Sequence, residues 1–263
     1  MPIRIKEQSP WQSQILVTKA LFKRELITRF GKYKLGVVWM LLDPLVRVIF
    51  LGLVLGPFLG RSTGVIPYVI FLLCGFIQLR LCTNTIRSSL AAISANNGLL
   101  VFKKVQAIDP FIARFIFQLF SYTFALVTFF LIAYWFGVLI SLDHLLGVVA
   151  CVMITWVIGC GLGLHLGILT HKFNELEKIL TYMLRPLLWI SCVLHPLSSV
   201  PPQYTKYLLY NPMVHTIEYM RMALFPGYLA EGVTLYYPAA VALCSIAYGM
   251  MTYRNNRHFL TQR

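Results

Sequence analysis

The sequence predicts an all-α integral membrane protein with six transmembrane helices and both termini in the cytoplasm. Of its 263 residues, 58% are hydrophobic and only 12% are charged, whereas about a quarter of the residues in a soluble domain are charged. The apolar residues form six long stretches, each near the length of about 20 residues that a helix needs to cross a bilayer. The 23 Lys and Arg residues are also unevenly distributed between the connecting segments.

Residues 1–35 precede the first apolar stretch and are too polar to cross a membrane. Placed on a helix, Trp11, Ile15, Phe22 and Leu26 share one face, and a proline at position 10 favours a helix start there. We therefore expect an amphipathic helix that lies along the cytoplasmic surface of the membrane. A soluble helix docked on a partner protein is the alternative.

The predicted spans are residues 37–59, 65–83, 111–140, 145–169, 179–200 and 236–253. They form a transmembrane domain over residues 36–253, and residues 254–263 are a cytoplasmic tail. If the N-terminus is inside, seventeen of the 23 basic residues fall on inner segments and three on outer segments. Cytoplasmic loops carry an excess of Lys and Arg, so this distribution places both termini in the cytoplasm. It also accounts for the net charge of +14 without a nucleic-acid partner.

Two glycine runs have four-residue spacing: Gly52 to Gly64 through the end of the first span, and Gly159 to Gly167 in the fourth. Small residues at this spacing allow two helix backbones to approach closely. The runs therefore predict tight helix contacts in a bundle.

The cytoplasmic segment 84–109 is polar, and its first half has apolar residues at helical spacing. A polar turn near Asn97 and Gly98 is followed by a short apolar group that includes Leu99, Leu100 and Phe102. Such a group is suited to docking into a groove on another protein. Insertion into the lipid surface is equally consistent with the composition. We take these five residues as candidates for docking an ATPase subunit.

The outer segment 195–235 predicts two short re-entrant helices before the last span. The first is expected over residues 203–210, and the second begins with Asn211 as its cap and Pro212 as its first residue. The second helix is expected to run to Leu224, with Glu218 and Arg221 paired on one face. Several tyrosines surround these helices, either as an interfacial belt or as rings that stack on sugars.

Charged residues inside the spans are informative because each costs about 2.5–3.5 kcal/mol at a helix centre. Asp43 and Arg47 are four residues apart and can pair on one helix face. Arg80 and Arg114 lie near the cytoplasmic ends of the second and third spans, where they can snorkel or attract a polyanion. Arg185 is deepest and precedes a proline. The candidates for a substrate path are these five residues together with Trp189, Tyr207 and Tyr210.

The sequence contains no P-loop, no nucleophile elbow and no zinc-protease motif. It has nine carboxylates and no spaced set of metal ligands. We therefore expect a non-catalytic subunit with no metal and no cofactor of its own. An intramembrane glycosyltransferase or acyltransferase is the alternative from another functional class.

Three motifs occur in order around these spans. They are RFGKYKLGVVW at residues 29–39, leading to Pro44; NGLL at residues 97–100, followed by Lys103, Lys104 and Pro110; and Asn211-Pro212, followed by Glu218 and Arg221. In this order they resemble the membrane subunits of ABC-2-type exporters, and most closely the permeases of capsular polysaccharide exporters (KpsM-like). Many polysaccharide permeases carry Arg-Asp before the fifth span, whereas this chain has NELEK at residues 174–178.

The resemblance implies that two copies form a channel in the bacterial inner membrane. It implies two ATP-binding cassette subunits, which bind ATP and Mg and dock on segment 84–109 and the N-terminal helix. The implied substrate is a capsular polysaccharide, acidic and lipid-linked, passed on to a periplasmic adaptor and outer-membrane export proteins. The same architecture exporting O-antigen, teichoic acid or another lipid-linked substrate is the alternative.

Overall fold

A computed structural model describes residues 10–30, 38–59, 66–96, 98, 105–173 and 175–261. The described residues form helices and contain no strand. The longer helices are α1 (Pro10–Phe30), α2 (Trp39–Leu59), α3 (Tyr68–Leu90), α5 (Asp109–Trp135), α6 (Leu145–Lys172) and α11 (Tyr236–Thr261). The shorter ones are α7 (Leu176–Met183), α8 (Leu187–Ile190), α9 (Pro202–Leu208) and α10 (Pro212–Leu224).

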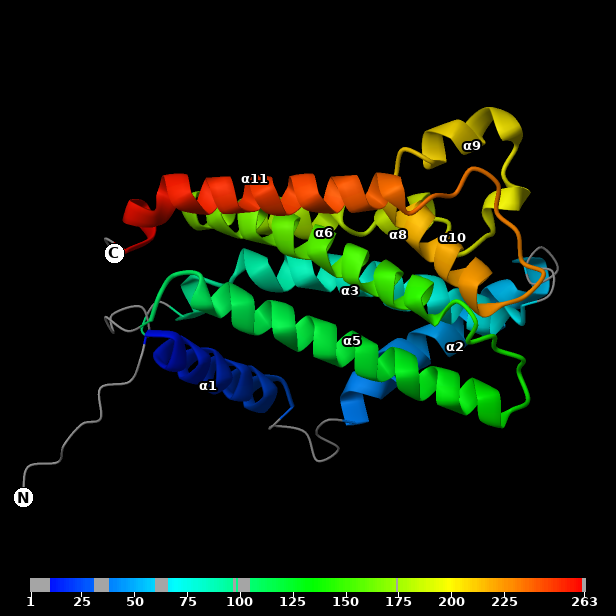
Figure 1. Ribbon diagram of the computed structural model, residues 1–263, viewed down its shortest axis with the longest axis horizontal. Helices are drawn as coiled ribbons and strands as arrows, with labels where there is room; N and C mark the ends of the chain where they lie inside the picture. The colour runs from blue at the N-terminus through cyan, green and yellow to red at the C-terminus, as the bar shows by residue number, and fades with distance from the viewer. Residues whose placement is uncertain are drawn as a thin grey trace, which may run out of the picture.

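Helix α3 lies at the centre of the bundle, between α6 on one side and α5 on the other (Figure 1). Helix α11 covers the far side of α6, and α2 packs on α3. In the apolar part of α3, 78% of the residues are buried, against 17% in α2. The centre of the fold is therefore α3, and α2 is a peripheral helix with most of its surface uncovered by this chain.

Helix α3 continues seven residues beyond the predicted end of the second span at residue 83. The hydroxyls of Thr83, Thr85 and Ser89 donate to carbonyls one turn earlier in the helix, at 2.9, 2.5 and 2.7 Å. Because these polar groups are satisfied within the helix, it passes through a polar stretch and stays buried. Ten helical residues follow Arg80, and its position near the cytoplasmic end of the second span stays a prediction.

The glycine run of α6 makes tight helix contacts, as predicted, and the helix that it meets is α3. A Cβ atom on Gly163 would lie 2.7 Å from Ser89 Oγ, and one on Gly167 would lie 2.5 Å from the Ser89 carbonyl oxygen. Gly161, on another face of α6, approaches the backbone of α11 so closely that a Cβ would lie 2.3 Å from the carbonyl carbon of Ser245. In α2, a Cβ on Gly52 would lie 3.1 Å from Val69. The end of the α2 run, Gly60 and Gly64, lies outside the described residues.

Among the described residues, four helices, α2, α3, α5 and α6, are by length and composition able to cross a membrane. Helix α11 carries no charge from Tyr236 to Tyr253, but its tyrosines make it less apolar than these four. The fifth predicted span, residues 179–200, is not one helix. It breaks at Arg185, whose N–H bonds to the Tyr182 carbonyl at 3.1 Å, because Pro186 has no N–H to continue the helix. The six-span arrangement therefore stays a prediction for the last two spans.

Helix α1 begins at Pro10, as expected, and packs along the first half of α5 (Figure 1). The Phe22 ring lies 6.0 Å from that of Phe117 and 6.2 Å from that of Phe120. Ile15, predicted on the same apolar face as Phe22, is 61% exposed. Helix α1 and the end of α11 lie at the end of the bundle where α3 ends and α5 begins. This arrangement agrees with two termini on one side, and the orientation stays a prediction.

Candidate functional site

The outer segment folds into the two predicted helices, α9 and α10. Helix α10 begins at Pro212 and ends at Leu224, as predicted, and Asn211 Oδ1 caps it by accepting from the Met213 N–H at 3.0 Å. The short side chain of asparagine reaches an N–H that has no partner within the helix, which fixes the start of the helix. Ten of the 13 residues of α10 are buried, and Glu218 and Arg221 are among them.

Glu218 and Arg221 form a fully buried ion pair, with 0% of either side chain exposed and 2.9 Å between Arg221 Nη1 and Glu218 Oε1. The guanidinium also donates to the backbone carbonyls of Cys192 at 2.8 Å, Val193 at 3.0 Å and Phe71 at 3.1 Å. It lies over the Phe71 ring, 3.4 Å from the centroid. One side chain therefore joins α10 to α3 and to the irregular segment that follows α8.

The Glu218 carboxylate has two further partners. Its Oε2 accepts from the Tyr228 hydroxyl at 2.6 Å, and its Oε1 accepts from the Leu197 N–H at 3.3 Å. Burial, with the Glu218 charge beside it, raises the pKa of Tyr228 well above its usual value, so this hydroxyl remains a donor. The buried ion pair thus holds four parts of the outer region together: α3, α10, segment 192–197 and the turn after α10.

Gly75 makes this arrangement possible. A Cβ atom at this position would lie 2.7 Å from Arg221 Nη2 and 3.2 Å from the Val193 Cα. Both distances are shorter than ordinary van der Waals contact. Because Gly75 has no side chain, the Arg221 guanidinium can approach closely enough to donate to the Phe71 carbonyl.

Asp43 and Arg47 also form the predicted pair, with 2.8 Å between Arg47 Nη2 and Asp43 Oδ1. This pair is uncovered, with 57% of the Asp43 side chain and 49% of the Arg47 side chain exposed. Arg80 of α3 interacts electrostatically with both charges. Its guanidinium lies 4.9 Å from the centre of the Phe76 ring. The structure therefore brings three of the predicted path residues together on α2 and α3.

Arg114 does not join this group. Its Nε lies 3.7 Å from Glu25 Oε2 of α1, and its Nη1 donates to the Ser88 carbonyl at the end of α3. Only 11% of its side chain is exposed. In this structure its contacts hold α1 to α3 and α5.

The remaining path candidates are exposed on the surface of this chain. The Arg185 guanidinium, at the break between α7 and α8, lies 4.6 Å from the centre of the Tyr182 ring. Trp189 is 64% exposed, Tyr207 61% and Tyr210 74%. The aromatic candidates thus have exposed rings around the outer segment and the broken fifth stretch, and the Lys206 ammonium lies over the Tyr207 ring, 5.1 Å from its centre.

Four docking candidates, Asn97, Leu99, Leu100 and Phe102, lie outside the described residues, and Gly98 is exposed. Helix α1 is bonded to both sides of this loop. Arg24 donates to Asn96 Oδ1 at 2.9 Å, and Gln14 donates to Asp109 Oδ1 at 2.5 Å. The two regions proposed to meet an ATPase are therefore connected to each other.

Sequence reasoning missed several partners of the charged residues. The E-x-x-R spacing indicated the buried ion pair, but no local signal indicated Tyr228 or the three carbonyls. Beside Arg80, the Asn84 amide donates to the Tyr122 hydroxyl, which links α3 to α5 and was likewise not expected. These contacts join residues far apart in the chain, and no spacing rule predicts them.

Comparison with known proteins gives a consistent result. The sequence profile described as ABC-2 type transporter matches residues 17–225. The polysialic acid transport protein KpsM of Escherichia coli is 36% identical over 247 residues, covering 94% of this chain and 96% of KpsM. The capsule polysaccharide export inner-membrane protein CtrC of Neisseria meningitidis serogroup A is 27% identical, covering 88% and 86%. BexB of Haemophilus influenzae, with the same description, is 25% identical, covering 84% and 82%.

Proposed function

Because the chain belongs to the ABC-2 type transporter family, we propose that it is the channel-forming permease of an ATP-driven exporter of acidic, lipid-linked capsular polysaccharide in the bacterial inner membrane. Two copies form the channel, and separate ATP-binding cassette subunits bind ATP and Mg and supply the energy. A periplasmic adaptor and an outer-membrane export protein receive the polymer. The similarity to KpsM over 94% of the chain supports the capsular substrate class.

The observation that carries this proposal is the exposed ion pair on α2. Asp43 and Arg47 lie in a helix able to cross the membrane, yet about half of each side chain is uncovered. An ionised side chain facing hydrocarbon costs about 2.5–3.5 kcal/mol, and such residues in membrane proteins face a partner or water. A second copy of the chain, or the water-filled path between two copies, removes this cost.

The charges and rings among the path candidates suit an acidic sugar polymer. Arg47, Arg80 and Arg185 supply positive charge along the helices, and Arg185 has no carboxylate partner among the described residues. The exposed rings of Trp189, Tyr207 and Tyr210 offer flat apolar faces at the outer end. We propose that these residues guide the polymer without binding it tightly.

Export is tested by Arg185→Ala, with the matched variant Lys178→Ala as a control because Lys178 is an exposed cation on α7. We expect Arg185→Ala to reduce surface polymer at least tenfold while polymer accumulates inside the cell, with Arg185→Lys partly restoring export. The control should export normally. Loss of polymer synthesis in Arg185→Ala would favour an intramembrane transferase instead.

ATPase docking is tested with the double variant Leu99→Asp/Leu100→Asp. A charged loop should no longer enter an apolar groove, so the nucleotide-binding subunit should not copurify with this variant. Insertion into the membrane should be unchanged. Normal copurification would place the docking site elsewhere, for instance on α1 alone.

A further inference from the structure

Helix α1 holds both ends of the loop that we propose as the ATPase-docking site. On one side Arg24 donates to Asn96 Oδ1 at 2.9 Å, and on the other Gln14 donates to Asp109 Oδ1 at 2.5 Å. Asn96 and Asp109 are both buried, so these bonds are protected from competing water. A displacement of the loop should therefore also displace α1.

The next residue of α1, Glu25, connects this helix to the bundle. Its Oε1 lies 2.8 Å from Arg29 Nε of the same helix, and its Oε2 lies 3.7 Å from Arg114 Nε of α5. The Arg114 Nη1 also donates to the Ser88 carbonyl of α3. The side chains of Glu25 and Arg114 are 18% and 11% exposed. One largely buried arginine on α5 thus contacts both α1 and the central helix α3.

The contact with Ser88 bypasses the turns that lead into the loop. Helix α3 ends at Leu90, and residues 91–96 form turns that end in the short 3-10 helix Ser94–Asn96. Such residues at the end of an element readily absorb a change in backbone angles. Ser88 and Arg114 lie inside α3 and α5. Their bond therefore reaches the central helix without passing through the turns.

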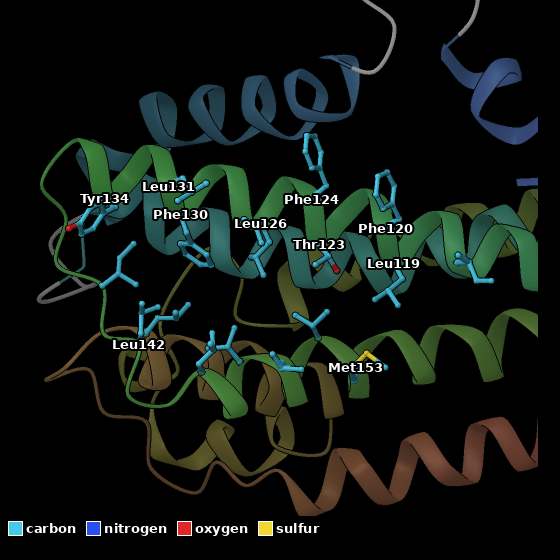
Figure 2. Close-up of a pocket in the computed structure, with 18 residues that line it drawn as sticks. Leu119, Phe120, Thr123, Phe124, Leu126, Phe130, Leu131, Tyr134, Leu142 and Met153 are labelled. Atoms are coloured by element: carbon cyan, nitrogen blue, oxygen red, sulfur yellow. The ribbon is translucent and has the colours of Figure 1, made fainter. Parts of the chain in front are cut away.

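The packing of α5 gives this bond particular weight. Helix α6 meets the α3 backbone closely at Gly163 and Gly167, whereas neither α1 nor α5 contains a glycine. An apolar groove of about 980 Å³ lies between α5 and α6, and Leu119 and Leu126 of α5 point toward the α6 side (Figure 2). Helix α5 is thus joined to its neighbours through side chains, which can rearrange more easily than close backbone contacts.

We propose that Arg114 is a positioning residue for export, which transmits a displacement of the docking loop and α1 to α3 through its contacts with Glu25 and Ser88. The inference rests on the function proposed above. A guanidinium suits this role because its planar set of five N–H donors can bind a carboxylate and a carbonyl together. If the link is broken, the separate ATPase subunit should still bind and hydrolyse ATP, but the membrane helices should no longer follow its motion.

The test uses the full-length chain with its copurifying ATPase subunit. Arg114→Met and Glu25→Gln break the link from its two sides, and the double variant breaks both. Arg114→Lys keeps the charge, and the control Lys23→Met removes an exposed cation of α1. Three quantities are measured for each form: surface polymer on intact cells, the amount of ATPase subunit in the purified complex, and its rate of ATP hydrolysis.

We expect both single variants to reduce surface polymer at least fivefold, while the amount of ATPase subunit and its hydrolysis rate stay within twofold. The double variant should export no less than the weaker single variant, because both changes break one link. Arg114→Lys should restore part of the export, and Lys23→Met should change nothing. If Arg114→Met fails to fold by size-exclusion chromatography, Glu25→Gln on the peripheral helix α1 decides.

Three results would overturn the proposal. Normal export by Glu25→Gln would show that Arg114 acts without α1, for instance by touching the polymer. Losses of export that multiply in the double variant would show two independent roles. A loss of ATPase subunit or of hydrolysis in step with export would show that the residues only support docking. If no ATPase subunit copurifies with the unchanged chain, the proposed function itself fails.

Discussion

Replacing Arg221 by Met removes the positive charge of the buried ion pair while keeping a long side chain. Glu218 then stays buried without its ion-pair partner, with Tyr228 and the Leu197 N–H as its remaining partners. Breaking a buried pair on one side typically costs about 3–5 kcal/mol. The three carbonyls that lose their donor are also left inside the protein, so we expect a value near the upper end. At about 2–4 °C per kcal/mol for a chain of this size, the melting temperature in detergent should fall by roughly 10–20 °C.

Glu218→Gln is the informative partner variant. It leaves Arg221 with its three carbonyl acceptors. Glu218→Gln should therefore lower the free energy of unfolding clearly less than Arg221→Met does. In the double variant no unpaired charge remains, and its cost should be at least about 1 kcal/mol less than the sum of the two single costs. Melting curves of all four forms, followed by size-exclusion chromatography, measure this coupling. Additive costs, or a melting temperature unchanged in Arg221→Met, would show that the ion pair does not hold the outer region together.

Three further variants test other contacts. Gly75→Ala should lower the melting temperature by several degrees, because overpacking a buried site costs about 1–3 kcal/mol and the new Cβ would lie 2.7 Å from the Arg221 guanidinium. Gly56→Ala is the control. Its Cβ would lie 3.5 Å from its nearest neighbour, so its melting temperature should be unchanged. Gly161→Ala should lower the yield of folded protein more than either, since the nearest atom, at 2.3 Å, is backbone. Asp43→Ala should impair export more than the double variant with Arg47→Ala, and additive losses of export would argue against a functional pair.

Periodicity and capping rules predicted the outer helices well. Asn211, Pro212 and Leu224 mark the ends of α10 in the structure as they did in the sequence, because a cap residue and a proline act locally. The pairing of residues three or four apart was also predictable for the same reason. These features depend on a few neighbouring residues, and no distant contact overrides them.

Features that depend on distant contacts were not predictable in this way. Helix α3 runs past residue 83, as the helical spacing of the apolar residues there predicted, but the contacts that bury this polar stretch, with its own carbonyls and with the glycines of α6, were not predictable. The break at Arg185 was signalled by Pro186, but the end of α8 at Ile190 was not. After α8 the chain is held in place because the Cys192 carbonyl accepts a hydrogen bond from Arg221, which lies 29 residues further along the chain.

The two ion pairs show why exposure carries information that spacing does not. Each has an acid followed by a base about one helical turn later, and each forms with its atoms 2.8–2.9 Å apart. The pair on α10 is sealed inside this chain, and backbone carbonyls compensate for the desolvation of its arginine. The pair on α2 has no such compensation among the described residues, although it lies in one of the apolar helices. A charge pair left uncovered in a membrane helix requires a further polar surface, so we propose that the α2 face meets a second copy of the chain or a hydrated path.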